Sequence, residues 1–193
     1  MFLKLKSERK KMIISLSNVR LAFPDLFTPK AFAVGDKPSF GATFLIPYGD
    51  KQNKLFEEGM VKLANEKWSE KGAATLKALI ANGKVSYQDG AKKEEYAGYA
   101  NHFSVTSRSP TRPLVINANK TPLVEADGKP YGGCFVNARL EMYAQDNAYG
   151  KRINCVLLGV QFVRDGESFG GSAPASANDF DDVSEGSDAE SLM

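Results

Sequence analysis

Residues 134–142 read Cys-Phe-Val-Asn-Ala-Arg-Leu-Glu-Met, and the character of the side chains alternates at every step. A period of two is typical of an antiparallel strand that buries only one of its faces. We therefore expect a half-buried strand here. Its core face carries Cys134, Val136, Ala138, Leu140 and Met142, and its other face carries Phe135, Asn137, Arg139, Glu141 and Tyr143.

A second strand is expected over residues 151–164, after a turn-rich segment at 145–150. Its apolar face changes partway, because Arg152 and Asn154 share a parity with the apolar residues that follow. A bulge or bend near Gly159 would explain the change, and such bends are common where a sheet curls toward a barrel. The two strands together predict a long curved hairpin.

The rest of the chain supplies shorter elements. We expect strands over 12–19, 39–46, 101–109 and 114–116, and helices over 51–71 and 73–81 with a break at Gly72. Two prolines predict a loop over 23–29, and polar residues predict a loop or irregular strand over 84–98. Five or six strands without a βαβ rhythm predict a mainly β protein, namely an OB-fold-like antiparallel β-barrel with inserted α-helices.

Charge divides the chain into three parts. Residues 1–11 form a basic extension, which is either a mobile arm or a start-site artefact with Met12 as the true start. Residues 12–169 form the folded domain, and residues 170–193 form a Gly/Ser/Ala linker with an acidic tail too poor in apolar residues to fold. Without the six tail acids, 17 of the 23 acids remain against 25 basic residues, so the body carries about +8.

The sequence offers little material for catalysis. Two cysteines on apolar strand faces are interpreted as buried thiols, and with His102 as the one histidine they cannot assemble a zinc site. Gly-rich phosphate loops and a nucleophile elbow are both missing. We therefore predict a protein that is not an enzyme and holds no metal or cofactor. With no apolar signal or membrane segment, we expect it in the cytoplasm.

Aromatic residues interleaved with cations are plentiful instead. Single-strand binders need flat rings to stack exposed bases and cations to follow the phosphates. The alternative is that the rings pack in the core and the cations only solvate the surface; for Trp68, a core anchor on a helix is the favoured interpretation. The candidate DNA-binding residues are Tyr96, Tyr99, Arg108, Arg112, Phe135, Arg139, Tyr143, Tyr149, Lys151 and Arg152.

Four segments have a familiar sequence. They are residues 112–123 with Arg-Pro and Asn-Lys-Thr-Pro-Leu, 127–137 with Asp-Gly-Lys-Pro-Tyr-Gly-Gly-Cys-Phe-Val-Asn, 147–153, and 158–167. With them the chain resembles a family of tailed-phage single-stranded DNA-binding proteins, from about Met12 onward and most densely between 112 and 170. The resemblance implies an OB-fold core, sequence-tolerant binding of single-stranded DNA, and an acidic tail that modulates binding or recruits replication proteins.

The leading hypothesis is thus a phage protein that coats single-stranded DNA during replication or recombination in the infected bacterial cell. The runner-up is a phage structural or assembly protein whose barrel binds protein partners. Expected partners are single-stranded DNA and, through the tail, phage or host replication proteins; a homodimer is compatible with the sequence. The regulatory tail comprises Asp179, Phe180, Asp181, Asp182, Glu185, Asp188 and Glu190.

Overall fold

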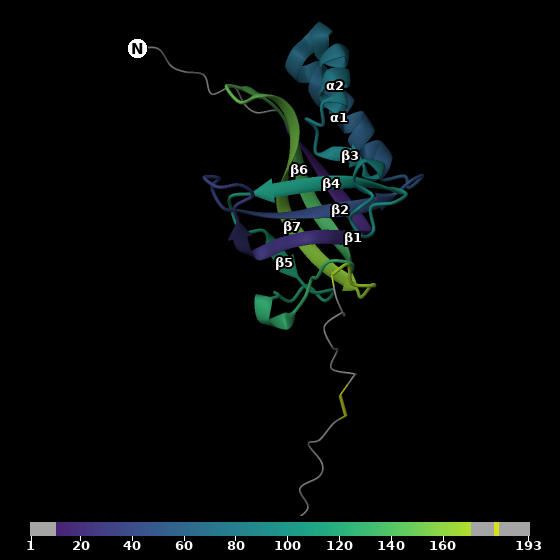
Figure 1. Ribbon diagram of the computed structural model, residues 1–193, viewed down its shortest axis with the longest axis vertical. Coiled ribbons are helices and arrows are strands. Elements are labelled where there is room, and N and C mark those ends of the chain that lie inside the picture. Colours follow the sequence, from purple (N-terminus) through teal and green to yellow (C-terminus); the bar gives the residue numbers. More distant parts are fainter. Residues whose placement is uncertain (1–10, 171–179, 182–193) are drawn as a thin grey trace, which may run out of the picture.

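Seven strands and two α-helices make up the computed structural model, which describes residues 11–170 and 180–181 (Figure 1). The basic segment 1–10 and the tail residues Asp179, Asp182, Glu185, Asp188 and Glu190 lie outside the described residues. The elements are β1 (Lys11–Lys30), β2 (Ser39–Pro47), α1 (Asn53–Trp68), α2 (Gly72–Ala81), β3 (Tyr87–Asp89), β4 (His102–Ser109), β5 (Leu114–Ile116), β6 (Phe135–Asn147) and β7 (Gly150–Arg164).

The predicted curved hairpin is confirmed as β6 and β7, which pair antiparallel from Phe135↔Arg164 to Asn147↔Gly150. Along β6 the even-numbered residues from Val136 to Ala144 are buried, and the odd-numbered ones are partly or fully exposed. A register shift falls between the pairs Arg139↔Gly159 and Leu140↔Leu157, so Leu158 is the extra residue of a bulge. The bulge turns Val160 and Phe162 into the core after Leu157, which explains the change of apolar parity.

The sheet closes on itself through five strands. Antiparallel neighbours follow the order β4-β2-β1-β6-β7, and a parallel pairing of β4 with β7 completes the ring. The direct pairing there is short, Ser107↔Cys155 and Arg108↔Val156, and residues 84–86 bridge the two strands beyond it through the hydrogen bonds of Ser86. A closed five-stranded barrel of this connectivity is an OB-fold, as predicted.

The loop predicted over 23–29 is wrong, because β1 continues through this segment to Lys30. The register with β2 shifts between Ala22 and Asp25 and again between Asp25 and Lys30. Pro24 and Pro29 fall inside these two shifts, where the strand ladder is interrupted and a missing backbone N–H is tolerated. The strand therefore continues past both prolines to Lys30.

The two helices lie between β2 and β4 in sequence and stand at one end of the barrel (Figure 1). Phe56 of α1 stacks on Tyr87 of β3 with ring centroids 5.2 Å apart. Gly59 faces β6 so closely that a Cβ there would lie 2.5 Å from the Cε of Met142. The helix break lies at the short 3₁₀ turn Ser69–Lys71, just before the expected Gly72, which is itself the first residue of α2.

The core fills the barrel and the helix contact, with Phe44, Leu16, Leu21, Leu140 and Ile153 among its fully buried side chains. Cys134 and Cys155 are buried free thiols, as predicted. Among residues 11–170 and 180–181, no helix combines the length and the apolar character that crossing a membrane requires.

Candidate functional site

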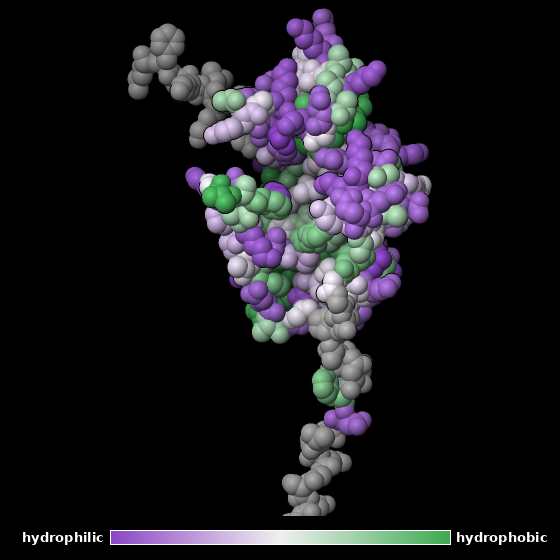
Figure 2. Space-filling model, viewed as in Figure 1, coloured by the Kyte–Doolittle hydropathy of each residue, from purple (hydrophilic) through white to green (hydrophobic). Residues whose placement is uncertain are grey.

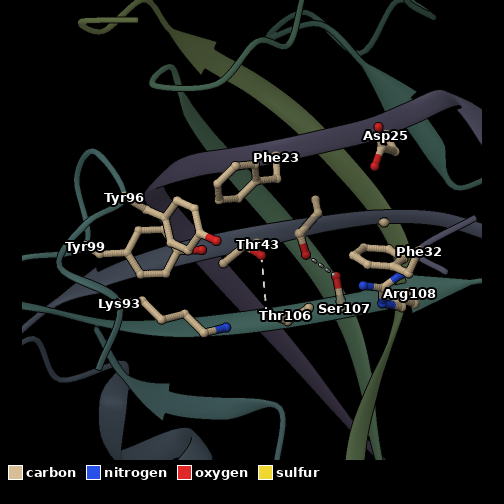
Figure 3. A pocket seen from close by; sticks show the side chains of 12 residues that line it. Phe23, Asp25, Phe32, Thr43, Lys93, Tyr96, Tyr99, Thr106, Ser107 and Arg108 are labelled. Carbon is tan, nitrogen blue, oxygen red and sulfur yellow. Dashed lines mark hydrogen bonds between the residues drawn. The ribbon is translucent and has the colours of Figure 1, made fainter. Parts of the chain in front are cut away.

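A hollow of about 240 Å³ lies on the outer face of β1, β2 and β4 (Figure 3). We call it the outer groove. Figure 2, in the same view as Figure 1, shows apolar side chains in the middle of this face with hydrophilic ones around them. The groove is lined by Phe23, Asp25, Phe32, Gly41, Ala42, Thr43, Lys93, Tyr96, Tyr99, Thr106, Ser107 and Arg108.

Three rings gather at one end of the outer groove. Phe23 meets Tyr96 edge to face at 5.2 Å between centroids, and Tyr99 lies 5.6 Å from Tyr96. Phe23 is 55% exposed and Tyr96 is 44% exposed, whereas Tyr99 is only 3% exposed. Tyr99 is therefore the buried support of the cluster, while Phe23 and Tyr96 offer ring surface to solvent.

Small side chains form the floor of the groove. In the register of β2 with β4, Thr43 pairs with Thr106 at the centre of the floor, and Gly41, which has no side chain, pairs with Arg108 at the cationic end. The hydroxyls of Thr43 and Thr106 are hydrogen-bonded at 3.3 Å. A floor without bulky side chains lets a flat ligand reach the strands between the aromatic and cationic ends.

Cations line the opposite end and side of the groove. Arg108 lies over the ring of Phe32 from the β1–β2 loop, and Lys93 borders the aromatic end (Figure 3). Burial lowers the pKa of Arg108, while Asp25 and Asp36 counter this shift; the guanidinium stays charged because its ordinary pKa is far above neutrality. Asp25 is itself neutralised by an ion pair with Lys30 at 2.6 Å.

Two further hollows continue the groove past Arg108 toward β7. One, of about 420 Å³, shares Lys93, Thr106 and Arg108 with the groove and adds Tyr143 and Arg152. The other, of about 560 Å³, lies between Phe32 and Arg152 and again includes Arg108. The three hollows thus form a path whose cations, Lys93, Arg108 and Arg152, have no ion pair with any described residue.

The structure brings together five of the ten predicted DNA-binding residues along this path: Tyr96, Tyr99, Arg108, Tyr143 and Arg152. The other five lie elsewhere. Phe135 is flanked by Arg20 on β1 and Arg164 on β7, with guanidinium carbons 5.7 and 3.4 Å from its ring centroid.

The remaining four occupy two other places. Arg139 hydrogen-bonds Ser15 in a hollow between β1, β6, β7 and β5, and Arg112 lies 5.5 Å from the ring centroid of Phe27. Tyr149, 89% exposed, and Lys151 lie at the tip of the β6–β7 hairpin. Trp68 braces this tip by donating a hydrogen bond from Nε1 to Asp146 at 2.8 Å, and it packs against the core as interpreted from the sequence.

Sequence reasoning missed Phe23 and Phe32, which supply the exposed rings at the two ends of the groove. Phe23 was assigned to a proline-rich loop, and its backbone at φ 47° lies in the register shift that turns its side chain outward. The sequence signal that could have identified Phe23 is its position directly before Pro24, where an interrupted strand can turn a side chain outward. Phe32 lies in the β1–β2 loop, one of the loops with which OB-folds contact oligonucleotides.

The described residues hold no group of three or more potential metal ligands. His102 has its Nδ1 atom 2.7 Å from the carbonyl oxygen of Ala100. In the tail, the described residues Phe180 and Asp181 are both exposed. The chemistry available along the path is therefore stacking on rings and neutralisation of anions.

Comparison with known proteins identifies the family to which the sequence is related. A family model described as the ssDNA-binding protein of Enterobacter phage Enc34 matches residues 11–192. Putative protein p50 of Acyrthosiphon pisum secondary endosymbiont phage 1 is 41% identical over 186 residues, which cover 94% of this chain and 99% of that protein.

Two solved structures share the fold. The single-stranded DNA-binding protein from bacteriophage Enc34, in complex with ssDNA, matches with a TM-score of 0.71 at 29% identity over 82% of this chain and 89% of that one. The single-stranded DNA-binding protein gp2.5 of bacteriophage T7 matches with a TM-score of 0.54 at 15% identity over 88% and 93% of the two chains. The second likeness supports the fold alone.

Proposed function

The chain belongs to the Enterobacter phage Enc34 ssDNA-binding protein family, and from this we propose that it binds single-stranded DNA in the outer groove. The observation that carries the proposal is the arrangement of exposed rings beside cations that have no ion pair with a described residue, along the outer face of β2 and β4. OB-folds bind oligonucleotides on this face and with the adjoining loops. A relative of 29% identity has been solved in complex with ssDNA, which supports the same assignment.

In this proposal, Tyr96 and Phe23 stack unpaired bases, and each such contact stabilises the complex by about 1–3 kcal/mol. Lys93, Arg108 and Arg152 neutralise successive phosphates along the path toward β7. Every base has a π-face, so stacking does not discriminate among sequences. The protein would therefore bind in a sequence-tolerant manner, and it would carry out no bond-breaking step.

We extend the path to the hairpin tip, where Tyr149 and Lys151 are exposed next to Arg152. Phe135, Arg139 and Arg112 lie off this path in the structure. In the infected host cell, such a protein would coat single strands exposed during phage DNA replication and recombination. Its acidic tail would compete with DNA for the groove and recruit replication proteins.

A salt titration tests the DNA-binding proposal directly. The full chain should bind labelled oligothymidylate and oligoadenylate with similar affinity. The logarithm of the binding constant should fall linearly with that of the salt concentration, with a slope of about −0.7 for each phosphate neutralised. Binding that is absent, or that is independent of salt, would overturn the proposal.

The same titration tests the tail when it is repeated on a chain that lacks residues 172–193. Removal of six acids should raise the affinity for oligothymidylate at low salt, and screening should shrink the difference at high salt. Equal or weaker binding by the shortened chain would refute competition between tail and DNA.

A further inference from the structure

The segment that follows β7 folds back onto the barrel and is held there by hydrogen bonds. Tyr131 donates from its hydroxyl to Asp165 at 2.9 Å, and the backbone N–H of Phe169 donates to the carbonyl of Gly132 at 3.0 Å. Arg20 of β1 donates to the carbonyls of Glu167 at 2.6 Å and Gly133 at 3.2 Å. We call residues 165–169 the return segment.

Glycine permits this close approach. At Gly133, with φ 107°, a Cβ would lie 2.0 Å from the carbonyl oxygen of Glu167. At Gly166 a Cβ would lie 2.3 Å from the carbonyl oxygen of Gly133. Such distances are far inside van der Waals contact, so the backbones pack together only because both positions lack a side chain.

The return segment ends by placing the ring of Phe169 on the loop that carries the aromatic end of the groove. A Cβ at Gly98 would lie 2.3 Å from the Cζ atom of Phe169, so the ring rests directly on this glycine. The ring also packs against a small cluster of Ala22, Leu45 and Tyr99, and Arg20 has its guanidinium carbon 4.2 Å from the ring centroid. This cluster is separate from the main core.

Gly98 and Tyr99 lie in the loop that presents Tyr96, and Tyr99 is the buried ring against which Tyr96 rests. We propose that Phe169 is a positioning residue for DNA binding. Its ring clamps Gly98 and Tyr99 against β2 and thereby fixes the exposed Tyr96 ring at the rim of the groove. The inference rests on the proposed function, because it assigns a task to a residue that does not itself line the groove.

A double-mutant cycle in the full-length chain tests the coupling. The probe is a labelled oligothymidylate about 20 nucleotides long, which exceeds the site of one OB-fold. Phe169→Ala and Tyr96→Ala should each weaken binding by about 5- to 10-fold. The double variant should bind no more than about twofold more weakly than Tyr96→Ala. Phe169 acts by positioning the Tyr96 ring, so its loss should have little further effect once that ring has been removed.

Phe27→Ala is the matched control, since Phe27 is also a partly buried phenylalanine but packs against the main core. Its effect on binding should be small and additive with that of Tyr96→Ala. Phe169→Leu retains apolar volume and should recover most of the affinity. If Phe169→Ala fails to fold, Phe169→Leu replaces it in the cycle. Phe169→Leu should then weaken binding of the probe by about twofold in the otherwise unaltered chain and should have no effect in the Tyr96→Ala chain.

The outcomes separate the two proposals. If the unaltered chain shows no salt-sensitive binding of the probe, the proposed function fails. If it binds and Tyr96→Ala weakens binding, but the Phe169 variants behave like Phe27→Ala or add fully to Tyr96→Ala, the positioning role alone is overturned.

Discussion

Tyr96 and Tyr99 lie three residues apart and have the same chemistry, yet the structure gives them different surroundings. Tyr96 is 44% exposed at the rim of the outer groove, while Tyr99 is 3% exposed beneath it, and burial raises the pKa of its hydroxyl. Their sequence context, a polar loop around Gly98, does not distinguish them. Tertiary contacts distinguish them, because Tyr99 packs with Ala22 and Leu45 and is joined there by Phe169.

Alanine variants should separate stacking from support. Tyr96→Ala should weaken binding of single-stranded DNA by about 5- to 10-fold, since a stacked base contributes about 1–3 kcal/mol, and should leave the melting temperature nearly unchanged. Tyr99→Ala should lower stability by about 3 kcal/mol because it empties a buried site. Fluorescence anisotropy and thermal melts measure both; a large loss of stability in Tyr96→Ala would contradict the assignment.

Two arginines of the same predicted set offer a comparison of electrostatics. Arg108 lines the groove, whereas Arg112 lies beside Phe27 and off the proposed path. Arg108→Gln should weaken DNA binding and reduce the salt slope by about 0.7, and Arg112→Gln should change neither. The comparison requires only binding constants at several salt concentrations, and equal slopes for the two variants would exclude Arg108 as a phosphate contact.

At the scale of elements, the β6–β7 hairpin was predictable down to its bend. Alternation of side chains is a local property, and the change of apolar parity in residues 151–164 predicted a bulge or bend near Gly159, which the structure places at Leu158. The course of β1 was not predictable in the same way. Pro24 and Pro29 argue against a strand unless the ladder is interrupted at both, and the interruptions depend on the pairing with β2.

The hairpin tip is braced by the end of α1, and this contact is testable. Trp68→Phe keeps an aromatic ring against the core but removes the hydrogen bond to Asp146. Stability to urea, followed by circular dichroism, should fall by about 1 kcal/mol. Amides in residues 145–151 should also exchange faster with deuterium. Unchanged exchange at the tip would show that the brace does not hold the hairpin.

At the scale of the whole molecule, the strand count and the missing βαβ rhythm were enough to predict an antiparallel barrel. The pairing that closes the barrel could not be predicted, because the parallel contact of β4 with β7 joins residues 107 and 155, which lie far apart in the sequence. The candidate site divides in the same way. Sequence reasoning found Arg108 and Arg152 but not Lys93, the third cation of the path. Phe135, Arg139 and Arg112 lie off the path because strand faces and loop positions are set by tertiary packing.

Both cysteines should report unfolding of the whole molecule. Burial raises the pKa of Cys134 to about 11 and that of Cys155 to about 12, so both thiols are protonated and shielded in the folded state. At pH 8 a thiol reagent such as Ellman's reagent should label neither cysteine until urea unfolds the chain. An unfolded thiol ionises near pH ~8.5, so stability should decline as the pH rises above that value. Rapid labelling of the native protein would contradict this burial.

The parallel pairing of β4 with β7 has fewer residue pairs than any other strand pairing that closes the barrel, and Arg108 is one of its residues. A single strand of DNA that runs from Tyr96 past Arg108 to Arg152 would cross the outer surface of this pairing and contact residues of both β4 and β7. A ligand that binds only the folded protein, in which the barrel is closed, stabilises that state against unfolding, and the stabilisation grows with the ligand concentration. Bound DNA would then stabilise the barrel that binds it. The DNA-bound protein should therefore resist proteolysis for longer than the free protein.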